Sequence, residues 1–415
     1  MGGKGKMRTL AICIPNYNRI DKLKGLLEEI TKQIVRDALE QEVEICISDD
    51  YSLEDPSRMI ADMEKMYPGI LFRYTRNVEN RGMDYNFLNC VLLAGSMYCW
   101  IIGNDDMPTS YGIQSVLKQL QKNQEKVDIM VTPFDIYTDA EEVRGTIEPL
   151  KVVRGQYVQF DTSKGDEYHN LLLSVQHNSG LFGFLSNTVF KRKKWIEYER
   201  KFQDKLNTIF IQMYMNIQTL EDGADYLYCP EKIIKNYADD ATNESVTRIC
   251  KILVGLNGVM DYFFSGEVKQ RLKKVIVDAY ISGIVWELPE EDKYKQKIKE
   301  IDTAKNMLYK TYFVEAEKRK QFFEKEEVVI FGAGNYGKKV LQQLKKYDVM
   351  VVAVIDSDPL KQGSLFYGYT IQNPSIIYEI YKESRPIVVV ANHFHLEEMV
   401  NTLLENKVDN IALIS

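Results

Sequence analysis

The stretch that decides the fold is Tyr98-Cys99-Trp100-Ile101-Ile102-Gly103-Asn104-Asp105-Asp106. Its first five residues form an apolar run of the length and composition of a buried strand, so the two acids should follow at the carboxyl end of that strand. In an open α/β sheet, ligands bind at this edge. Adjacent carboxylates there suit a divalent cation such as Mg²⁺ or Mn²⁺, and such a cation in turn holds phosphate.

Strand and helix signals alternate upstream of this stretch. Apolar runs at 10–14, 43–47 and 70–74 read as strands, and apolar residues at helical spacing lie between them. This βαβαβ order predicts an α/β fold with a mainly parallel sheet and helices on both faces. We expect Pro15 to end the first strand, and residues 205–220 to form a helix.

Composition excludes several classes of protein. The chain has 415 residues, a net charge of −7 and a sequence pI near 5.5, whereas a nucleic-acid binder would carry a basic face. No apolar run approaches the roughly 18 residues of a membrane span, and the basic N-terminus lacks the apolar centre of a signal peptide. We expect the six cysteines to be buried and reduced, as in a cytoplasmic protein.

The chain divides into three parts by pattern. Residues 7–245 hold the alternating α/β pattern, which loosens after Asp106. Residues 246–325 are helical, and dense charge from Glu290 to Lys325 is typical of a solvated connector. A new strand opens a second α/β domain, which we place at 326–415.

Polar segments follow the expected strands of the first domain in four places. Each has an ordinary alternative as a turn, a helix cap or a polar loop, but four in succession, each after its own strand, favour a ligand site. Glycine permits a close backbone approach, and a helix N-terminus favours an anion. The first segment holds the candidates Pro15, Tyr17 and Asn18 of Pro15-Asn16-Tyr17-Asn18, and the second holds Asp49 and Asp50. The third holds Asn80, Gly82 and Asn86, and the fourth holds Asn104, Asp105 and Asp106.

These motifs resemble those of family 2 glycosyltransferases, which have the GT-A fold. The likeness covers residues 7–135, and the segment around Asp105 is most similar to the abequosyltransferase-like branch, which builds bacterial surface polysaccharides. The resemblance implies nucleotide-sugar contacts at Pro15, Tyr17, Asn18, Asp49 and Asp50. It also places Asn80, Gly82 and Asn86 beside the diphosphate, and Asn104 is a further donor-binding residue. The family's Asp-x-Asp metal motif aligns with Gly103-Asn104-Asp105, so its first acid is missing here. By this alignment Asp105 is expected to bind the metal ion, and the neighbouring Asp106 is expected to assist it.

The resemblance further implies that an acceptor hydroxyl attacks the anomeric carbon of the donor with inversion. A bound cation would neutralise the leaving diphosphate, and a carboxylate is expected to take the proton of the acceptor. The family's Glu-Asp pair should fall near Ile211-Gln212, which has no acid. Asp204 is therefore the first candidate base and His177 the second; either could instead be structural or solvated.

A second glycine motif begins the C-terminal domain. The turn is Gly332-Ala333-Gly334-Asn335-Tyr336-Gly337, and Asp356 ends the next expected strand about twenty residues later. This context predicts a Rossmann-like nucleotide site formed by Gly332, Gly334, Asn335, Tyr336, Gly337 and Asp356. Residues 327–415 resemble the N-terminal domains of bacterial sugar acyltransferases, which implies a nucleotide-sugar ligand. NAD, or no ligand at all, are the alternatives.

Three functions follow. The first is a cytoplasmic, metal-dependent inverting glycosyltransferase that uses Mg²⁺ or Mn²⁺ and acts on a glycan or lipid-linked acceptor. Such an enzyme could contact the inner face of the membrane, and it could form a homo-oligomer. The second is a NAD-linked sugar-nucleotide oxidoreductase, which the lack of a clear catalytic half for a dehydrogenase weakens. The third is a non-catalytic nucleotide-sugar scaffold.

Overall fold

The structure is a computed structural model, and it describes residues 7–123, 126–138, 141–153, 155–237, 246–278, 320–324, 326–391 and 396–413. The chain divides into two compact units. Residues up to 243 and residues 254–276 form the first unit, and residues 244–253 and 277–415 form the second. The expected connector at 246–325 therefore contributes helices to the first unit, and most of its charged part lies outside the described residues.

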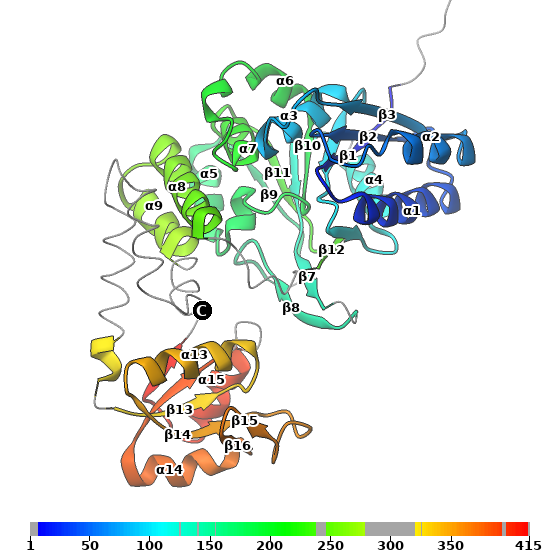
Figure 1. Cartoon of the computed structure of the whole chain (residues 1–415). Coiled ribbons are helices and arrows are strands. Elements are labelled where there is room, and N and C mark those ends of the chain that lie inside the picture. The colour runs from blue at the N-terminus through cyan, green and yellow to red at the C-terminus, as the bar shows by residue number, and fades with distance from the viewer. Residues whose placement is uncertain are drawn as a thin grey trace, which may run out of the picture. The chain divides into compact units, whose positions relative to one another are not determined.

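An eight-stranded sheet forms the core of the first unit (Figure 1). Strands β1 to β4 and β6 and β11 share one direction, while β10 and β9 run antiparallel to their neighbours. The α/β class with a mainly parallel sheet is thus confirmed. In spatial order the strands are β3 (Leu71–Arg76), β2 (Val43–Asp49), β1 (Leu10–Asn16), β4 (Tyr98–Ile101), β10 (Thr188–Lys191), β6 (Ile129–Val131), β11 (Asp225–Tyr228) and β9 (Val158–Asp161).

Helices cover both faces of this sheet because their apolar residues recur at helical spacing. Helix α3 lies against β1 and β2, and α1 lies with α4 on the opposite face (Figure 1). The helices described between residues 7 and 278 are α1 (Ile20–Arg36), α2 (Ser57–Met66), α3 (Met83–Leu93), α4 (Gly112–Lys122), α5 (Gly165–Ser174), α6 (Arg192–Tyr198), α7 (Ile211–Glu221), α8 (Val246–Phe263), α9 (Gly266–Leu272) and the short helices η1 (Asn178–Leu181), η2 (Gln203–Lys205) and η3 (Lys273–Asp278).

A smaller sheet extends the unit beyond the acid motif. Its order is β5 (Asp106–Pro108), β12 (Ile234–Tyr237), β7 (Phe134–Tyr137) and β8 (Val143–Ile147). Strand β5 begins at Asp106 itself, which pairs with Asn236 on β12. The second acid of the motif is therefore fixed in a sheet, not in a loop.

Two local expectations are wrong. Strand β1 continues through Pro15 to Asn16. Its neighbour β4 ends opposite Cys13, so the missing N–H of the proline removes no ladder bond on that side. The helix expected at 205–220 begins only at Ile211, because Asn207 and Ile209 have positive φ angles of 85° and 63°, outside the helical range.

The second unit contains an open parallel sheet. Apolar clusters cover both faces of its central strand β13. In spatial order the strands are β15 (Leu365–Phe366), β16 (Tyr369–Gln372), β14 (Met350–Ile355), β13 (Glu327–Phe331), β17 (Ile387–Val390) and β18 (Ile411–Leu413), and only β15 is antiparallel. The helices are α13 (Asn335–Lys346), η4 (Pro374–Ile376), α14 (Ile377–Ser384) and α15 (Leu396–Glu405). Across all described residues, no helix combines the length and apolarity needed to cross a bilayer.

Candidate functional site

The carboxyl ends of β1, β2 and β4 meet at one edge of the central sheet. The parallel register pairs Asn16 with Asp49, and Ile101 with Cys13. Since the polar segments follow these strands directly, the register brings them together. The edge predicted from the sequence is thus the place where the structure gathers the candidate residues.

Asn16 lies at the centre of this edge and is 1% exposed. Its amide nitrogen donates to Oδ1 of Asp49 at 2.7 Å, and its Oδ1 accepts from the Asn104 amide at 2.8 Å. Its backbone carbonyl accepts from the Asn86 amide at 3.2 Å. Asn16 therefore ties the second, third and fourth segments to the first. Sequence reasoning did not single it out, although it stands inside the Pro-Asn-Tyr-Asn motif.

The carboxylates of Asp49 and Asp50 are engaged within the protein. Asp49 is fully buried and accepts from Asn16, from the Ser52 backbone N–H at 3.0 Å and from Arg76 Nε at 3.2 Å. Asp50 is 2% exposed and accepts the backbone N–H groups of Arg81 at 2.9 Å and Gly82 at 2.8 Å. Both acids thus order the neighbouring loops of this edge.

The third segment is a tight turn that needs its glycine. Gly82 has a φ of +90°, and a Cβ there would lie 3.2 Å from Oδ1 of Asn207. Oδ1 of Asn80 accepts the Gly82 N–H at 3.0 Å. Asn86, one turn into α3, is buried, and its Oδ1 has no hydrogen-bond partner among the described residues. This buried acceptor, beside the Asn16 carbonyl, is left unsatisfied by the described residues.

The first segment presents its side chains outward. Tyr17 is 46% exposed, so its ring is available for stacking on a base or a sugar. Asn18 adopts a left-handed conformation, and its Oδ1 accepts the backbone N–H of Leu53 at 2.8 Å. Pro15 is part of β1. The outer surface of this edge is therefore formed by aromatic and amide groups held on a hydrogen-bonded frame.

The two acids of the central motif have different environments. Asp105 is partly exposed and forms an ion pair with Arg19 at the start of α1. Asp106 is 4% exposed, and it accepts from Ser186 Oγ at 2.5 Å and from the Asn236 amide at 2.7 Å. Burial and the neighbouring charge of Asp105 raise the pKa of Asp106 to about 7.

This electrostatic arrangement fits a divalent cation. A cation would remove the repulsion between the acids, and at Asp105 it would compete with the guanidinium of Arg19. Two carboxylates alone do not complete a shell, and the described residues contain no group of three or more His, Cys, Asp or Glu side chains able to hold an ion. Phosphate oxygens and water complete such shells for Mg²⁺ and Mn²⁺. The donor set therefore fits a cation shared with a diphosphate.

Asp84 is a further residue that sequence reasoning missed. It lies in the first turn of α3 with 2% exposure, and its carboxylate accepts the backbone N–H groups of Ile209 at 2.7 Å and Ile211 at 3.3 Å. Burial raises its pKa, against these hydrogen bonds, which lower it. Asp84 joins the Gly82 turn to the start of α7, and an acid in the first turn of a helix gives no sign of such a distant partner.

The two candidate bases belong to two short helices, η2 and η1. Asp204 lies in η2 and pairs with Lys205 at 2.6 Å; this hydrogen bond lowers the pKa of Asp204. The side chain of His177 caps η1, where Nδ1 accepts the Ser179 N–H at 3.1 Å. Near the start of α7, where the family acid pair is expected, the buried side chain of Gln212 has an Oε1 without a described partner.

The glycine turn of the second unit connects β13 to α13. Gly332 has a φ of +113°, and a Cβ on Gly337 would lie 1.9 Å from the Gly332 carbonyl oxygen. Space around Gly334 is open, and Asn335 and Tyr336 begin α13. Asp356 accepts the Ala333 N–H at 2.7 Å and pairs with Lys361 at 3.1 Å. The residues predicted for this turn thus share one sheet edge, with Asp356 bound to the turn itself.

Comparisons with known proteins agree with these features. Residues 11–192 match the model of glycosyl transferase family 2, and residues 324–414 match a model described as C2185-like, N-terminal. The N-terminal region therefore carries a domain of the glycosyltransferase family. The chain is 30% identical to abequosyltransferase RfbV of Salmonella typhimurium over 187 residues. This aligned region covers 45% of this chain and 54% of that protein. The chain thus spans about half the length of that relative.

Solved structures of glycosyltransferases resemble the chain more distantly. The mannosyltransferase PcManGT from Pyrobaculum calidifontis, in complex with GDP-Man and Mn²⁺, is 12% identical with a TM-score of 0.47, over 84% of this chain and 89% of that one. TarS of S. aureus, residues 1–349 with UDP-GlcNAc, is 11% identical with a TM-score of 0.47, over 76% and 92% of the two chains. Likenesses of this size add no argument about the site.

Proposed function

We propose that this protein is an inverting glycosyltransferase that moves a sugar from a nucleotide-sugar to a glycan or lipid-linked acceptor in the synthesis of a bacterial surface polysaccharide. The observation that carries the proposal is the hydrogen-bonded frame of Asn16, Asp49, Asp50 and Asn104 at one sheet edge. It lies within the region that matches the glycosyltransferase family model. The relative named as an abequosyltransferase supports the same activity.

The donor would lie along this edge. Tyr17 and Asn18 would contact the base and ribose, supported from below by Asp49 and Asp50. The Asn80–Gly82 turn would lie beside the diphosphate, and Asn86 on α3 would stand next to it. Arg19, held beside Asp105, offers a guanidinium to the phosphates. Most of these contacts come from groups that the frame fixes before the donor arrives.

Asp105 would hold a divalent cation, Mg²⁺ or Mn²⁺, with Asp106 at its side. When bound, the cation supplies positive charge that stabilises the leaving diphosphate. Asp106 itself is held in place by Ser186 and by Asn236 of β12, so its position is fixed without the cation.

The proton of the acceptor hydroxyl would go to His177 or Asp204. The lowered pKa of Asp204 makes its carboxylate a weaker base, so His177 is the better supported of the two. Conversion of His177 to Ala should then reduce kcat more than conversion of Asp204 to Asn.

The second unit would bind a nucleotide-sugar, or a dinucleotide such as NAD, at its glycine turn. Two glycines are sterically required there, and Gly334 leaves open space before the N-terminus of α13. The protein would act in the cytoplasm, at the inner face of the membrane where lipid-linked acceptors lie. A homo-oligomer is compatible with this proposal.

A thermal-shift screen of UDP-, GDP-, CDP- and dTDP-sugars, with and without Mn²⁺, tests the proposed function. At least one donor should stabilise the protein only with Mn²⁺, and Asp105→Ala should abolish the shift. The matched control is Asp62→Ala, which removes an exposed acid on α2 and should leave the shift intact. The proposal fails if no nucleotide-sugar gives a Mn²⁺-dependent shift, or if Asp105→Ala keeps that shift. Stabilisation by NAD with no effect of any nucleotide-sugar would favour the oxidoreductase instead.

A further inference from the structure

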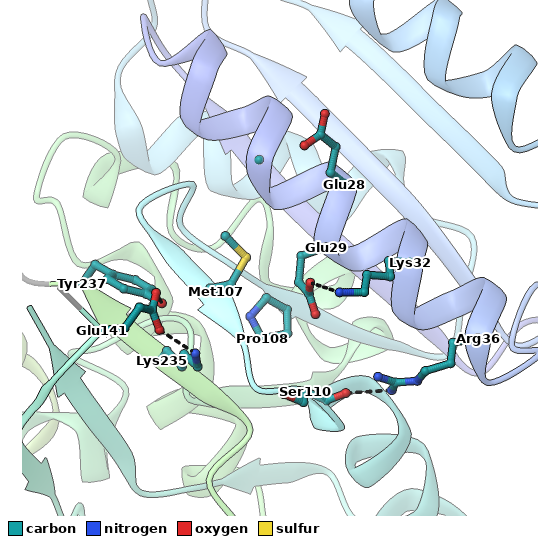
Figure 2. A pocket seen from close by; sticks show the side chains of 11 residues that line it. Glu28, Glu29, Lys32, Arg36, Met107, Pro108, Ser110, Glu141, Lys235 and Tyr237 are labelled. Atoms are coloured by element: carbon teal, nitrogen blue, oxygen red, sulfur yellow. Dashed lines mark hydrogen bonds and ion pairs between the residues drawn. The ribbon is translucent and has the colours of Figure 1, made fainter. Parts of the chain in front are cut away.

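A hollow lies in the first unit, between α1 and the β5–β12 pair (Figure 2). Its volume is about 510 Å³, which is within the range of ligand-binding pockets. Figure 2 shows Met107 and Pro108 of β5 facing α1, with Tyr237 and Lys235 of β12 beside them. None of the residues assigned to the donor or the cation lines it.

Helix α1 forms one wall of this α1–β5 pocket. Gly25, Glu29, Lys32 and Arg36 recur at spacings of four, three and four residues, which places them on one side of the helix. Gly25 is inside the helix, and a Cβ built on it would meet nothing within 4 Å. The room above Gly25 is therefore part of the pocket, and no backbone conformation requires a glycine there.

The opposite wall combines an apolar floor with polar groups. Met107, Pro108 and the ring of Tyr237 supply the apolar surface. Glu141 accepts from Lys235 at 2.9 Å and also from the Tyr237 hydroxyl, which lowers the pKa of Glu141. This network keeps the tyrosine ring and the charged groups in place before any ligand binds.

Charge and hydrogen-bonding capacity define the ligand class. The lining holds three acids, Glu28, Glu29 and Glu141, and three bases, Lys32, Arg36 and Lys235, so its formal charge balances and favours neither an anion nor a cation. Lys32 lies 3.7 Å from Glu29, longer than a hydrogen bond, and its side chain is 71% exposed. A sugar hydroxyl both donates and accepts, so it can bond to both signs of charge, while its C–H face packs on Tyr237 and Pro108.

We propose that the α1–β5 pocket binds an uncharged saccharide. Its identification as a part of the acceptor glycan away from the reacting hydroxyl rests on the proposed function. The pocket adjoins the acid motif, since Met107 follows Asp106 on β5 and Lys235 and Tyr237 flank Asn236, the partner of Asp106. Successive residues of a strand point to opposite faces, so Lys235 and Tyr237 lie on the face of β12 opposite to Asn236.

Saturation-transfer NMR on the full chain tests this site with lactose, maltose, chitobiose and O-antigen oligosaccharides as probes, without donor or metal. At least one probe should receive saturation from the wild-type protein. Gly25→Leu fills the pocket and should weaken that binding by about tenfold or more, equivalent to about 1.4 kcal/mol. Gly25→Ala is the matched control: it removes the same glycine, leaves most of the room and should keep binding within about twofold.

Two further variants separate this site from the donor site. Tyr237→Ala removes the ring from the floor and should weaken saccharide binding, whereas Asp105→Ala should not change it. The inference is overturned if no probe binds, if Gly25→Leu binds as Gly25→Ala does, or if Asp105→Ala abolishes saccharide binding. Loss of nucleotide-sugar binding with retained saccharide binding would instead remove the proposed function and leave the pocket assignment standing.

Discussion

Asp106 is a carboxylate that the folded protein holds at a free-energy cost. It is 4% exposed, it adjoins Asp105, and its pKa is raised to about 7. The folded state therefore binds its proton more tightly than the unfolded chain does. The protonation of Asp106 therefore contributes to the free energy of unfolding at low pH, and this contribution is lost as the pH rises from about 4 through 7. A buried acid that repels its neighbour is common where a protein prepares a charged site.

Replacement of Asp106 by Asn should therefore stabilise the metal-free protein, and more at pH 8 than at pH 5. The difference should grow by up to about 1.4 kcal/mol for each pH unit in this range. Urea unfolding followed by circular dichroism, in the presence of a chelator, measures it. Asp128→Asn, at a half-buried acid paired with Lys191 at 3.0 Å, is the comparison and should not stabilise the protein. A stabilisation by Asp106→Asn that is independent of pH would contradict the electrostatic explanation.

The residues that organise the site were harder to predict than those on its surface. Proline, glycine and paired acids mark the candidate segments in the sequence, because their backbone or charge properties are local. Asn16 and Asp84 act through partners 33 to 127 positions away. Spacing along the chain carries no information about such contacts, so only the fold identifies these two residues.

At the scale of elements, the connection between α3 and α7 depends on one carboxylate. The loop before α7 includes Ile209 at a φ of 63°, a conformation that β-branched residues rarely adopt. Asp84 accepts the N–H groups of Ile209 and Ile211 and thereby offsets the strain. The spacing of apolar residues from 205 onward could not reveal this loop, because the apolar residues of the loop fit a helix as well as they fit a loop.

Asp84→Ala should therefore lower the free energy of unfolding by about 1–3 kcal/mol, since it leaves two backbone N–H groups without a partner. Asp84→Asn keeps one acceptor oxygen and should lose less. Hydrogen exchange of peptides covering 205–213 should accelerate in Asp84→Ala. Asp166→Ala is the matched control, an acid in the first turn of the exposed start of α5. Equal effects of the two alanine variants would show that Asp84 acts only as a local helix residue.

At the scale of the whole molecule, each of the two units has its own apolar core. The order of strands and helices in both was predictable, because strand and helix periodicities alternate clearly at 10–122 and 327–413. The boundary was not, since the helical pattern from 246 gives no sign that residues 254–276 join the first unit. A helix that packs against the core of a unit and a helix in a connector can show the same spacing of apolar residues.

Separate cores mean that a defect in one unit should stay within it. A Cβ on Gly337 would lie 1.9 Å from the Gly332 carbonyl oxygen, and backbone cannot move aside without distorting the β13–α13 turn. Gly337→Ala should destabilise the second unit by several kcal/mol, on the order of other severe core clashes. Gly334→Ala, three residues earlier in open space, should be neutral. Hydrogen exchange resolved by peptide should show faster exchange over 327–391 in Gly337→Ala alone, with β1 to β4 unchanged. Faster exchange throughout the chain would mean that the second unit supports the first, and the donor site would then depend on it.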